Sequence, residues 1–517
     1  MMKELKETLD RNGNMILTEN GATGYSTTTR NPLVDLNFRV PSRHCNVGDN
    51  ELMDFTYSLH VNFVETIKWM FYLRDVREGL GERVSFVRLF YILNDLYPDV
   101  AVKLVPLIPE YGRYKDLIDI LECHNDDSVI GQEIYNFINM QLKTDLINMS
   151  ENKPVSLLAK WMPSINASIK ARKMAKRFAK KFGLPFVDYR KMLSNLRKYI
   201  DVTEVKTCGN KWAEIDYNKV SSNANIRYTD AFMKHDYDRR MEYIESLSKP
   251  ESKSKMNAST LYPYEIYAKY CRNMYQDKNE DKSLEEMWKN LKSVESIGHT
   301  LCVCDNSGSM TTLLPGCLST RAIDVSRSLS VFFSERCTSE FKDKIIAFSS
   351  HPYYIDLSNC KSLVDKINVL NKCDDCSNTN IKRTFDLVLK TAIDNNLSQS
   401  DLPDNILIIS DMEFDYATVT NGYSHEDNMS KYKTLFENIR TQWESYGYKL
   451  PKLIFWNVLS RTNAIQLTEN ECGVILVSGF SVNNVKMVLS GELEPYKALK
   501  FVLDSKRYDK VEDVLKS

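Results

Sequence analysis

The sequence predicts a multidomain chain of α + α/β class, in which an α-helical part is followed by a doubly wound α/β domain. Between residues 51 and 296, apolar side chains recur at the i, i+3, i+4 spacing of amphipathic helices, and no convincing alternating strand interrupts them. After residue 299, short β-branched runs alternate with amphipathic stretches, which is typical of a parallel sheet covered by helices. A chain of 517 residues also exceeds what a single hydrophobic core usually holds.

The composition is that of a globular, intracellular protein. Hydrophobic residues make up 43% and charged residues 26% of the chain, which excludes a fibrous or largely disordered class. The charged start MMKELKETLD lacks the apolar core of a signal peptide, and no apolar run is long enough for a membrane span. Twelve cysteines without a dense framework indicate reduced thiols. We therefore expect a cytoplasmic protein without a membrane partner, or a virion-associated one if the gene is viral.

The N-terminal part divides into two expected segments. Residues 1–50 are rich in Asn, Thr, Gly and Ser and are expected to be mostly irregular. Residues 51–296 form the predicted helical domain, with the clearest helical spacing over 51–76, 83–96 and 129–147. Helices joined by short Gly- and Pro-containing breaks favour a HEAT-like α-helical repeat, although no repeat of fixed period is visible. In REGLGE (77–82) the glycines predict a tight interhelical turn, because no Gly-Lys-Ser/Thr of a nucleotide-binding loop follows.

Residues 297–517 form the predicted α/β domain. Its expected strands are the runs TLCVCD (300–305), KIIAFSS (344–350), NILIISD (405–411), KLIFWNV (452–458) and GVILVSGF (473–480). Helical stretches between them predict helices on both faces of a parallel sheet. Ligands of such sheets bind at the carboxyl ends of the strands, near the point where the strand order reverses.

Side chains with oxygen atoms lie at the ends of two of these strands and in a loop that precedes a helix. LCVCDNSGSM places Asp305, Ser307 and Ser309 after the first strand, and we expect the turn to need Gly308 or an equally permissive residue. Thr379 precedes a helix in a second loop, and Asp411 ends the strand NILIISD. Hard oxygen ligands with few charges suit Mg²⁺, Mn²⁺ or Ca²⁺ rather than a metal that seeks thiolates. A coordination position left open would accept a carboxylate or phosphate from a partner.

This Asp-x-Ser-x-Ser, Thr, Asp order resembles the metal-ion-dependent adhesion site of von Willebrand factor A domains. All five positions of that motif have a matching residue in this sequence: Asp305, Ser307, Ser309, Thr379 and Asp411. Taken alone, DNSGS reads equally well as a polar turn without a metal. The later Thr and Asp at the expected places favour a metal site, and the resemblance implies that residues 297–517 adopt the von Willebrand A fold.

The charge is distributed unevenly along the chain. Residues 1–150 carry a net charge of −7, residues 151–300 of +10 and residues 301–517 of −4, although the whole chain is at −1. The segment ASIKARKMAKRFAKKFG (167–183) contains no acid and seven cations, namely Lys170, Arg172, Lys173, Lys176, Arg177, Lys180 and Lys181. Apolar residues between them recur at helical spacing, so one face can pack while the rest presents cations. The pattern favours phosphate binding, with a merely solvated charged face as the alternative.

Aromatic side chains near this basic helix are candidates for stacking on unpaired bases. They are Trp161, Tyr189, Tyr199 and Trp212, each of which is also a candidate core residue.

Two further resemblances concern the whole chain. A helical-repeat domain followed by a von Willebrand A domain resembles the Ro autoantigen (TROVE) family, ring-shaped proteins that bind small non-coding and misfolded RNAs. The chain is more similar to a domain-of-unknown-function family found in large DNA viruses, phages and eukaryotes. This likeness rests on YLRDVREGLGER, IPEYGRYKDL, LLAKWMPS, WAEIDYNKVSS and SDMEFD. The architecture shared with Ro proteins implies RNA binding, but fold alone does not establish function.

The leading hypothesis is a non-enzymatic, intracellular RNA-binding scaffold with a magnesium-binding A domain. A second hypothesis is a protein-interaction module whose metal receives an acidic side chain from a protein partner. A third is a metal-dependent nuclease, suggested by the alternation of Asp411, Glu413 and Asp415, for which no general base is evident. The pair Cys373 and Cys376 has zinc-type spacing but lacks a second Cys/His pair. No hydrolase triad is visible, and the oligomeric state is left open.

Overall fold

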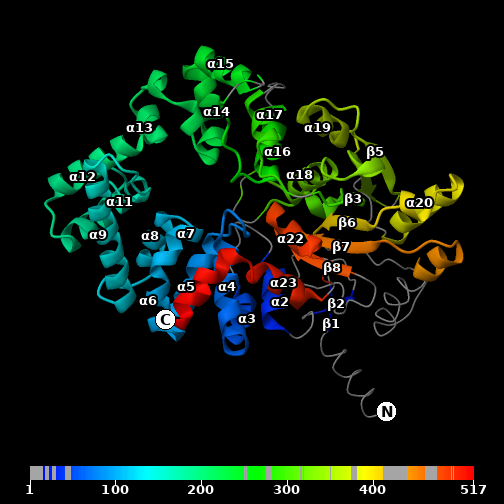
Figure 1. The fold of residues 1–517 in the computed structure, drawn as a ribbon, viewed down its shortest axis with the longest axis horizontal. Helices are drawn as coiled ribbons and strands as arrows, with labels where there is room; N and C mark the ends of the chain where they lie inside the picture. Colours follow the sequence, from blue (N-terminus) through cyan, green and yellow to red (C-terminus); the bar gives the residue numbers. More distant parts are fainter. Residues whose placement is uncertain are drawn as a thin grey trace, which may run out of the picture. The chain divides into compact units, whose positions relative to one another are not determined.

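The computed structural model shows two compact units (Figure 1). It describes residues 15–17, 23–25, 31–40, 48–247, 249, 251, 253–274, 282–294, 296–314, 317, 319–349, 351–373, 381–411, 439–459, 474–490, 492 and 494–517. One unit, the α/β unit, comprises Met1–Thr66 and Leu261–Ser505, and the other, the helical unit, comprises Ile67–Thr260 and Lys506–Ser517. The two units are interleaved along the chain, whereas the sequence predicts consecutive domains that meet near residue 297.

A six-stranded mixed sheet forms the centre of the α/β unit. Its spatial order is β5-β4-β3-β6-β7-β8, and its strands are β3 (Thr300–Asp305), β4 (Lys344–Phe348), β5 (Tyr353–Asp356), β6 (Asn405–Ser410), β7 (Lys452–Asn457) and β8 (Val474–Ser478). The five predicted strands are all present and pair in parallel. The prediction of a purely parallel sheet is wrong at β5, which pairs antiparallel with β4 at the sheet edge. Its half-exposed YYID run lacks the continuous apolar character of a central strand.

Helices cover both faces of this sheet. On one face, Val303, Ile408 and Phe455 of three adjacent strands pack with Phe385 of α20 (Ile381–Asp394) and with Trp443. On the other face lies α18 (Ala322–Ser334), which contacts β3 and β6. Ser326 of α18 donates its hydroxyl to the Ile409 carbonyl at 2.8 Å. Both faces are therefore buried, which explains why these strands are almost continuously apolar.

Residues near the N-terminus contribute regular structure to the α/β unit. Helix α2 (Pro32–Arg39) begins at Asn31, whose Oδ1 accepts a hydrogen bond from the Leu33 amide at 3.0 Å, as N-cap residues do. It packs against β8, α23 (Pro495–Leu503) and α3 (Asp49–Val61), and Arg39 forms an ion pair with Asp54 of α3. Two short strands, β1 (Met15–Leu17) and β2 (Thr23–Tyr25), pair antiparallel. The expectation that residues 1–50 are mostly irregular is therefore wrong for the buried helix α2.

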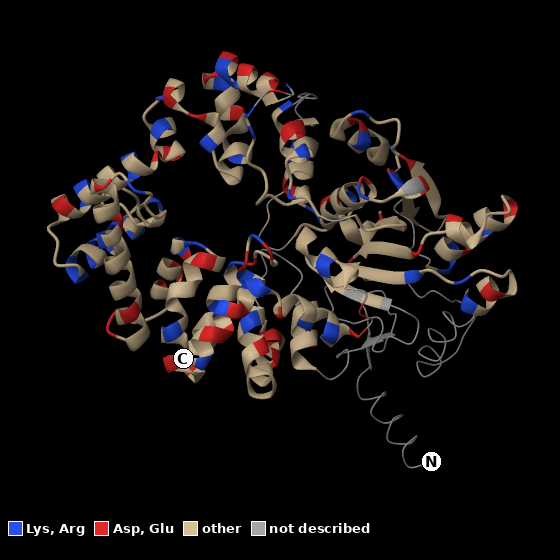
Figure 2. Ribbon diagram, in the orientation of Figure 1, with Lys and Arg blue, Asp and Glu red and all other residues tan. Residues whose placement is uncertain are grey.

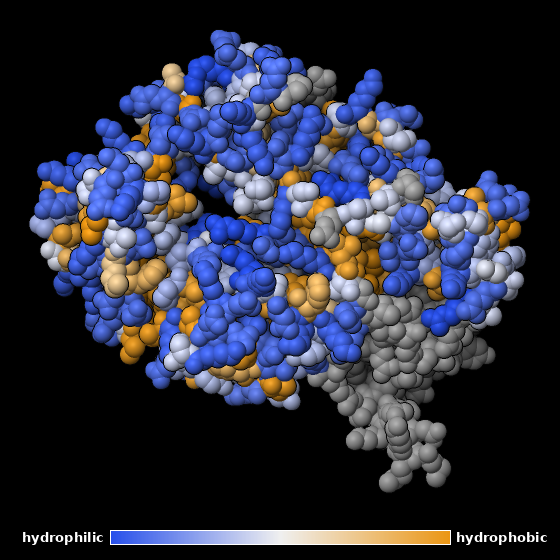
Figure 3. Space-filling model, in the orientation of Figure 1, coloured by the Kyte–Doolittle hydropathy of each residue, from blue (hydrophilic) through white to orange (hydrophobic). Residues whose placement is uncertain are grey.

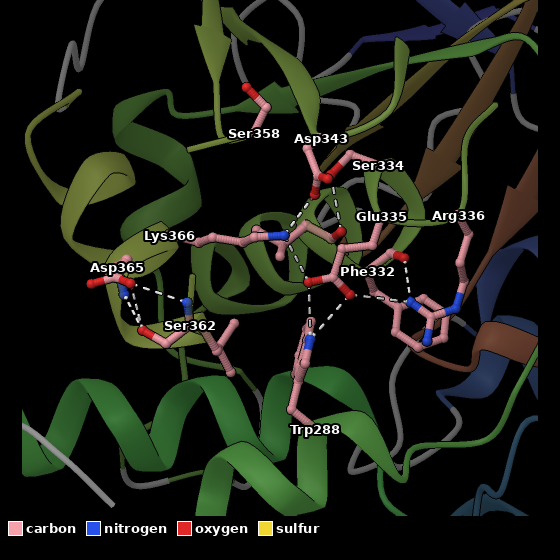
Figure 4. Close-up of polar contacts among 12 residues, drawn as sticks. Trp288, Phe332, Ser334, Glu335, Arg336, Asp343, Ser358, Ser362, Asp365 and Lys366 are labelled. Carbon is pink, nitrogen blue, oxygen red and sulfur yellow. Dashed lines mark hydrogen bonds and ion pairs between the residues drawn. The ribbon is translucent and has the colours of Figure 1, made fainter. Parts of the chain in front are cut away.

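Three further helices are joined by a charged cluster around Glu335 (Figure 4). Glu335 lies at the end of α18 and accepts hydrogen bonds from Trp288 of α17 (Lys282–Lys289) at 3.1 Å and from Lys366 of α19 (Leu363–Asn371) at 3.0 Å. Lys366 also donates to Asp343 at 2.6 Å. Burial alone would lower the pKa of Lys366, but the two carboxylates outweigh it and raise that pKa. The cluster thus stabilises the ammonium and holds the three helices together.

The remaining helices of the α/β unit are α16 (Pro263–Met274), which packs on α18, and α22 (Val485–Leu489), which follows β8. Short 3-10 turns in this unit lie at Gly308–Thr311, Ser339–Phe341, Gln399–Asp401 and Val482–Asn484.

The helical unit contains no strand among its described residues, in agreement with the predicted helical region. Its α-helices are α4 (Phe63–Arg74), whose first turn belongs to the α/β unit, α5 (Val84–Leu96), α6 (Pro98–Leu104), α7 (Ile108–Tyr111), α8 (Tyr114–Glu122), α9 (Val129–Ser150), α10 (Leu158–Trp161), α11 (Ile169–Lys181), α12 (Phe186–Ile200), α13 (Thr203–Cys208), α14 (Ser222–His235), α15 (Tyr237–Leu247) and α24 (Asp509–Lys516). Its 3-10 turns are Val105–Leu107, Trp212–Glu214, Tyr217–Lys219 and Lys506–Tyr508.

The turn between α4 and α5 requires its two glycines, as predicted. A Cβ on Gly79 would lie 1.9 Å from the Tyr72 carbonyl oxygen, and Gly81 has a φ of +69°. The turn presents Asp75, which is buried and accepts a hydrogen bond from Arg507 Nε at 2.8 Å. The end of the chain is thereby fixed to the helical unit, because α24 follows Arg507 directly.

No helix within the described ranges is long and apolar enough to cross a membrane. The face drawn in Figure 3 is mainly hydrophilic, with scattered apolar side chains, which is the usual surface of a protein in water.

Candidate functional site

The strand order of the sheet reverses between β3 and β6. From β3 the chain continues to β4 and β5 on one side, and then returns to β6, β7 and β8 on the other. Asp305 is the last residue of β3, and Asp411 directly follows β6, so the two carboxylates stand at adjacent carboxyl ends of the sheet. A reversal of this kind opens a crevice for ligands in doubly wound sheets. The two acids predicted from the sequence are thus placed at the switch point.

The Asp305 carboxylate is held from two sides. Only 1% of the residue is exposed. Its Oδ1 accepts a hydrogen bond of 2.9 Å from the Ser307 amide, and its Oδ2 accepts one of 2.5 Å from the hydroxyl of Ser410 at the end of β6. Hydrogen bonds from such donors compensate for the loss of water around a buried carboxylate. The side chain is therefore fixed in orientation.

Two serine hydroxyls lie next to this carboxylate. Ser307 precedes the 3-10 turn Gly308–Thr311, and its Oγ lies 2.9 Å from the Oγ of Ser309 within that turn. The expectation that this turn needs a conformationally permissive residue at position 308 is wrong, because a Cβ on Gly308 would meet no atom within 4 Å and its φ is not positive. The spacing of the two serines, rather than glycine, brings their hydroxyls together.

Four of the five predicted metal ligands can be placed. Asp305, Ser307 and Ser309 come together at the end of β3, and Asp411, 1% exposed, stands at the end of the adjacent strand β6. Thr379 lies outside the described residues, as do Cys376, Glu413 and Asp415 of the zinc and nuclease hypotheses. In the part of the chain that is described, no three His, Cys, Asp or Glu side chains cluster as a metal site. Carboxylate and hydroxyl oxygens are the kind of hard ligand that Mg²⁺ prefers.

Sequence reasoning missed two polar residues at the same edge of the sheet. Asn457 ends β7 and Ser478 ends β8, and strand register aligns both with Ser410. Both are fully or almost fully buried, and within the described ranges neither the amide atoms of Asn457 nor the hydroxyl of Ser478 has a hydrogen-bond partner. Together with Asp305 and Ser410 they form a polar row across four adjacent strands. In the sequence they read as ordinary strand ends, and only the register shows that they are aligned.

The predicted basic helix is present as α11, and Figure 2 shows Lys and Arg along it. Ser168 begins the helix, and its hydroxyl accepts a hydrogen bond from the Ala171 amide at 3.3 Å. Met174, Ala175 and Phe178 are buried, and the Phe178 ring packs edge-on against Tyr135 of α9 at 5.1 Å. One face of α11 therefore packs on the helical unit, and the opposite face is free to present its cations.

Three of the seven cations are engaged by acids at the end of α8 and in the loop between α8 and α9. Lys170 pairs with Glu122 at 2.8 Å and Lys181 with Asp127 at 2.7 Å, and Arg177 forms a bidentate pair with Asp126. The hydrogen bonds from Arg177 hold the pKa of Asp126 below its ordinary value. A fourth cation, Arg172, donates to the Ile165 carbonyl at 3.0 Å. The segment 167–183 contains no acid itself, but in the folded helical unit acids from outside the segment pair with it.

The other three cations, Lys173, Lys176 and Lys180, are exposed and form no ion pair with a described residue. Steps of three and four residues place them on one face of α11, about 4.5 Å and about 6 Å apart along the helix axis. They form the basic stripe of α11, defined by these three residues.

The four aromatic candidates for base stacking are engaged elsewhere. The Arg113 guanidinium lies 4.8 Å from the centre of the Trp161 ring, and Trp212 stacks on His235 at 4.6 Å. Tyr189 is fully buried, and the Tyr199 hydroxyl donates to the Lys153 carbonyl at 2.9 Å. The exposed aromatic next to the basic stripe is Phe186, the first residue of α12. The sequence does not single it out, because its place beside α11 depends on the turn between the two helices.

The described residues define an α + α/β protein with a polar site at the switch point of a mixed sheet and a basic stripe on a helical unit. Two family models match the chain: residues 132–297 match Domain of unknown function (DUF2828), and residues 299–514 match Domain of unknown function (DUF7788). The chain is 25% identical over 532 residues to "Uncharacterized protein L728" of Acanthamoeba polyphaga mimivirus, which covers 95% of this chain and 87% of that protein. These similarities fit the predicted likeness to an uncharacterised family found in large DNA viruses.

Proposed function

We propose that the protein is a non-enzymatic RNA-binding scaffold that contacts RNA phosphates through the basic stripe of α11. The single observation that carries this proposal is the exposure of Lys173, Lys176 and Lys180 on one helix face, with no acidic partner among the described residues. Nearby acids neutralise the flanking cations Lys170, Arg177 and Lys181, so these three lysines are the part of the helix left to meet an external anion. A line of ammonium groups along a helix suits the regularly spaced charges of a phosphate backbone.

The α/β unit would hold a divalent cation within the same scaffold. The switch-point oxygens of Asp305, Ser307, Ser309 and Asp411 support the proposed likeness to von Willebrand A domains, with Thr379 as the fifth expected ligand. A bound Mg²⁺ would supply a Lewis-acidic point to which an acidic group of a partner can bind. Metal-dependent recruitment of a protein is therefore part of the proposed scaffold role. For the helical unit, we propose a HEAT-like or TROVE-like repeat fold.

RNA affinity and its salt dependence test this function. Three phosphate contacts predict that log K for single-stranded RNA falls with log salt with a slope of about −2. The triple reversal Lys173→Glu, Lys176→Glu, Lys180→Glu should abolish binding at physiological salt. A matched control reverses Lys153, Lys211 and Lys219, three exposed lysines of the same unit, and changes the net charge equally. Binding that is absent in the wild type, or equally lost in the control, would overturn the proposal.

A further inference from the structure

An open pocket of about 500 Å³ lies beside the basic stripe, between α11 and the start of α12. Its walls are Lys173, Lys176, Arg177, Lys180, Leu184, Pro185 and Phe186. All three lysines of the stripe therefore line it, and its other wall is apolar. The pocket combines a cluster of cations with an aromatic ring, which is an unusual pairing on a surface exposed to water.

The turn between the helices creates this arrangement. Gly183 follows α11 with a φ of +66°, and the Leu184 amide donates to the Ala179 carbonyl at 2.9 Å, the bond that closes a Schellman-type helix end. Pro185 is the N-cap residue of α12, and Phe186 follows it as the first residue of that helix. The Lys176 ammonium lies 5.6 Å from the centre of the Phe186 ring. Phe186 is 47% exposed. A half-exposed aromatic side chain therefore lies next to the basic stripe.

Two chemistries meet within this pocket. Ammonium groups bind phosphates, and an exposed phenyl ring offers a surface on which a nucleobase can stack. A paired A-form helix keeps its bases stacked inside and presents mainly phosphates and 2′-hydroxyls, whereas an unpaired nucleotide can present both its base and its phosphates. An acidic peptide with an apolar side chain is the competing ligand, but it does not match the line of three cations along the helix as a phosphate backbone does.

We infer that this pocket binds an unpaired nucleotide, with its base stacked on Phe186 and the flanking phosphates on Lys173, Lys176 and Lys180. The inference rests on the proposed function and narrows the substrate class to single-stranded or unpaired RNA. Phe186 supplies the preference for unpaired over paired RNA, while the lysines supply most of the affinity. The volume of about 500 Å³ is large enough to accommodate one nucleobase.

The test compares a mixed-sequence single-stranded RNA with a duplex of equal length, using the full chain and fluorescence anisotropy. Phe186→Ala should weaken single-strand binding about 5-fold to 150-fold, the loss typical of one stacked base, and leave duplex binding within about 2-fold. Phe186→Trp should restore the affinity, and its indole emission should be quenched by the single strand. Val187→Ala removes an exposed neighbour that does not line the pocket, and should change neither affinity.

Each outcome separates the pocket from the proposed function. If Phe186→Ala and Phe186→Trp both bind the single strand as the wild type does, while the triple lysine reversal abolishes binding, the pocket assignment is wrong and the phosphate-binding function stands. If Phe186→Ala weakens the binding of the single strand and of the duplex equally, the ring has a structural role and the inference is wrong. If the wild type binds neither RNA but captures an acidic peptide, both the inference and the proposed function fall.

Discussion

The hydroxyl of Ser410 donates a hydrogen bond of 2.5 Å to the carboxylate of Asp305 and so joins the carboxyl ends of β6 and β3. The two residues are adjacent across the position at which the strand order of the sheet reverses. The bond orients the Asp305 side chain before any ligand arrives. A preoriented carboxylate loses less conformational entropy on binding a cation than a mobile one would.

The first prediction concerns Mg²⁺ binding at this site. We expect Mg²⁺ to raise the melting temperature of the wild type, because a ligand that binds only the folded state stabilises it by about 2.7 kcal/mol at 100 times its Kd. Asp305→Asn and Asp411→Asn should each abolish this shift in differential scanning fluorimetry. Asp356→Asn, on the edge strand β5, serves as the control and should keep it. An equal shift in all four proteins would rule out the switch-point site.

The second prediction concerns Asn457. Its side chain is fully buried, and neither amide atom has a hydrogen-bond partner. An apolar residue of similar size removes this desolvation penalty, so Asn457→Leu should leave the free energy of unfolding unchanged or raise it by about 1 kcal/mol. Urea unfolding measures the change. Trp456→Leu, at the neighbouring buried position, should lower stability through the cavity it leaves. A loss of more than about 2 kcal/mol in Asn457→Leu would show that the amide contributes to the fold.

The third prediction concerns the cluster around Glu335 (Figure 4). Lys366, with 9% of its side chain exposed, bonds two carboxylates that are themselves partly buried. Lys366→Ala leaves these carboxylates together without a cation and should lower the free energy of unfolding by about 2 kcal/mol, less than a fully buried pair would lose. Lys344→Ala breaks the exposed pair with Glu340 and should cost less than about 1 kcal/mol. Equal effects of the two changes would contradict the role assigned to the cluster.

The fourth prediction is a pH dependence that arises from Glu512 of α24. Hydrogen bonds from Lys516 and Lys68 lower the pKa of Glu512 from 4.5 to about 2. A depressed carboxyl pKa gives stability that is present above pH 4.5 and is lost as the pH falls toward 2, because the unfolded chain takes up the proton first. Glu512→Gln should therefore be less stable than the wild type at pH 7, with the difference narrowing as the pH falls from 4.5 toward 2.

Urea unfolding between pH 2.5 and pH 7 measures this difference. Glu214→Gln, at an exposed position that pairs with Lys211, should follow the wild-type curve. A constant gap between Glu512→Gln and the wild type across the range would show that Glu512 acts by another route than its charge.

The elements that the sequence predicted well are those whose signal is local. The run TLCVCD is apolar throughout because both faces of β3 are buried, and the strand spans Thr300–Asp305 as expected. The sequence indicates the turn at Gly79 and Gly81 because glycine favours a positive φ and permits close approach of the backbone. The structure shows a φ of +69° at Gly81, and a Cβ on Gly79 would lie 1.9 Å from a carbonyl oxygen. Asp305 and Asp411 were likewise placed correctly, because each stands at the end of an apolar run that forms a strand.

The features that the sequence did not predict depend on contacts between distant segments. Which cations of α11 are paired depends on the acids Glu122, Asp126 and Asp127. These acids precede the cations by about fifty residues and approach them only in the folded protein. The burial of α2 depends on β8 and α23, near the other end of the chain. The pocket at Phe186 depends on the direction of a turn. Composition and periodicity carry none of this information.

The measurement that tests the central claim most directly is the sequencing of nucleic acid that co-purifies with the protein. The wild type and the triple reversal of Lys173, Lys176 and Lys180 are expressed equally and purified in parallel without high-salt washes. We predict that RNA is recovered with the wild type, enriched in unpaired segments, and is depleted at least tenfold from the variant. Recovery of no RNA with the wild type, or of equal amounts with both proteins, would contradict RNA binding through the basic stripe.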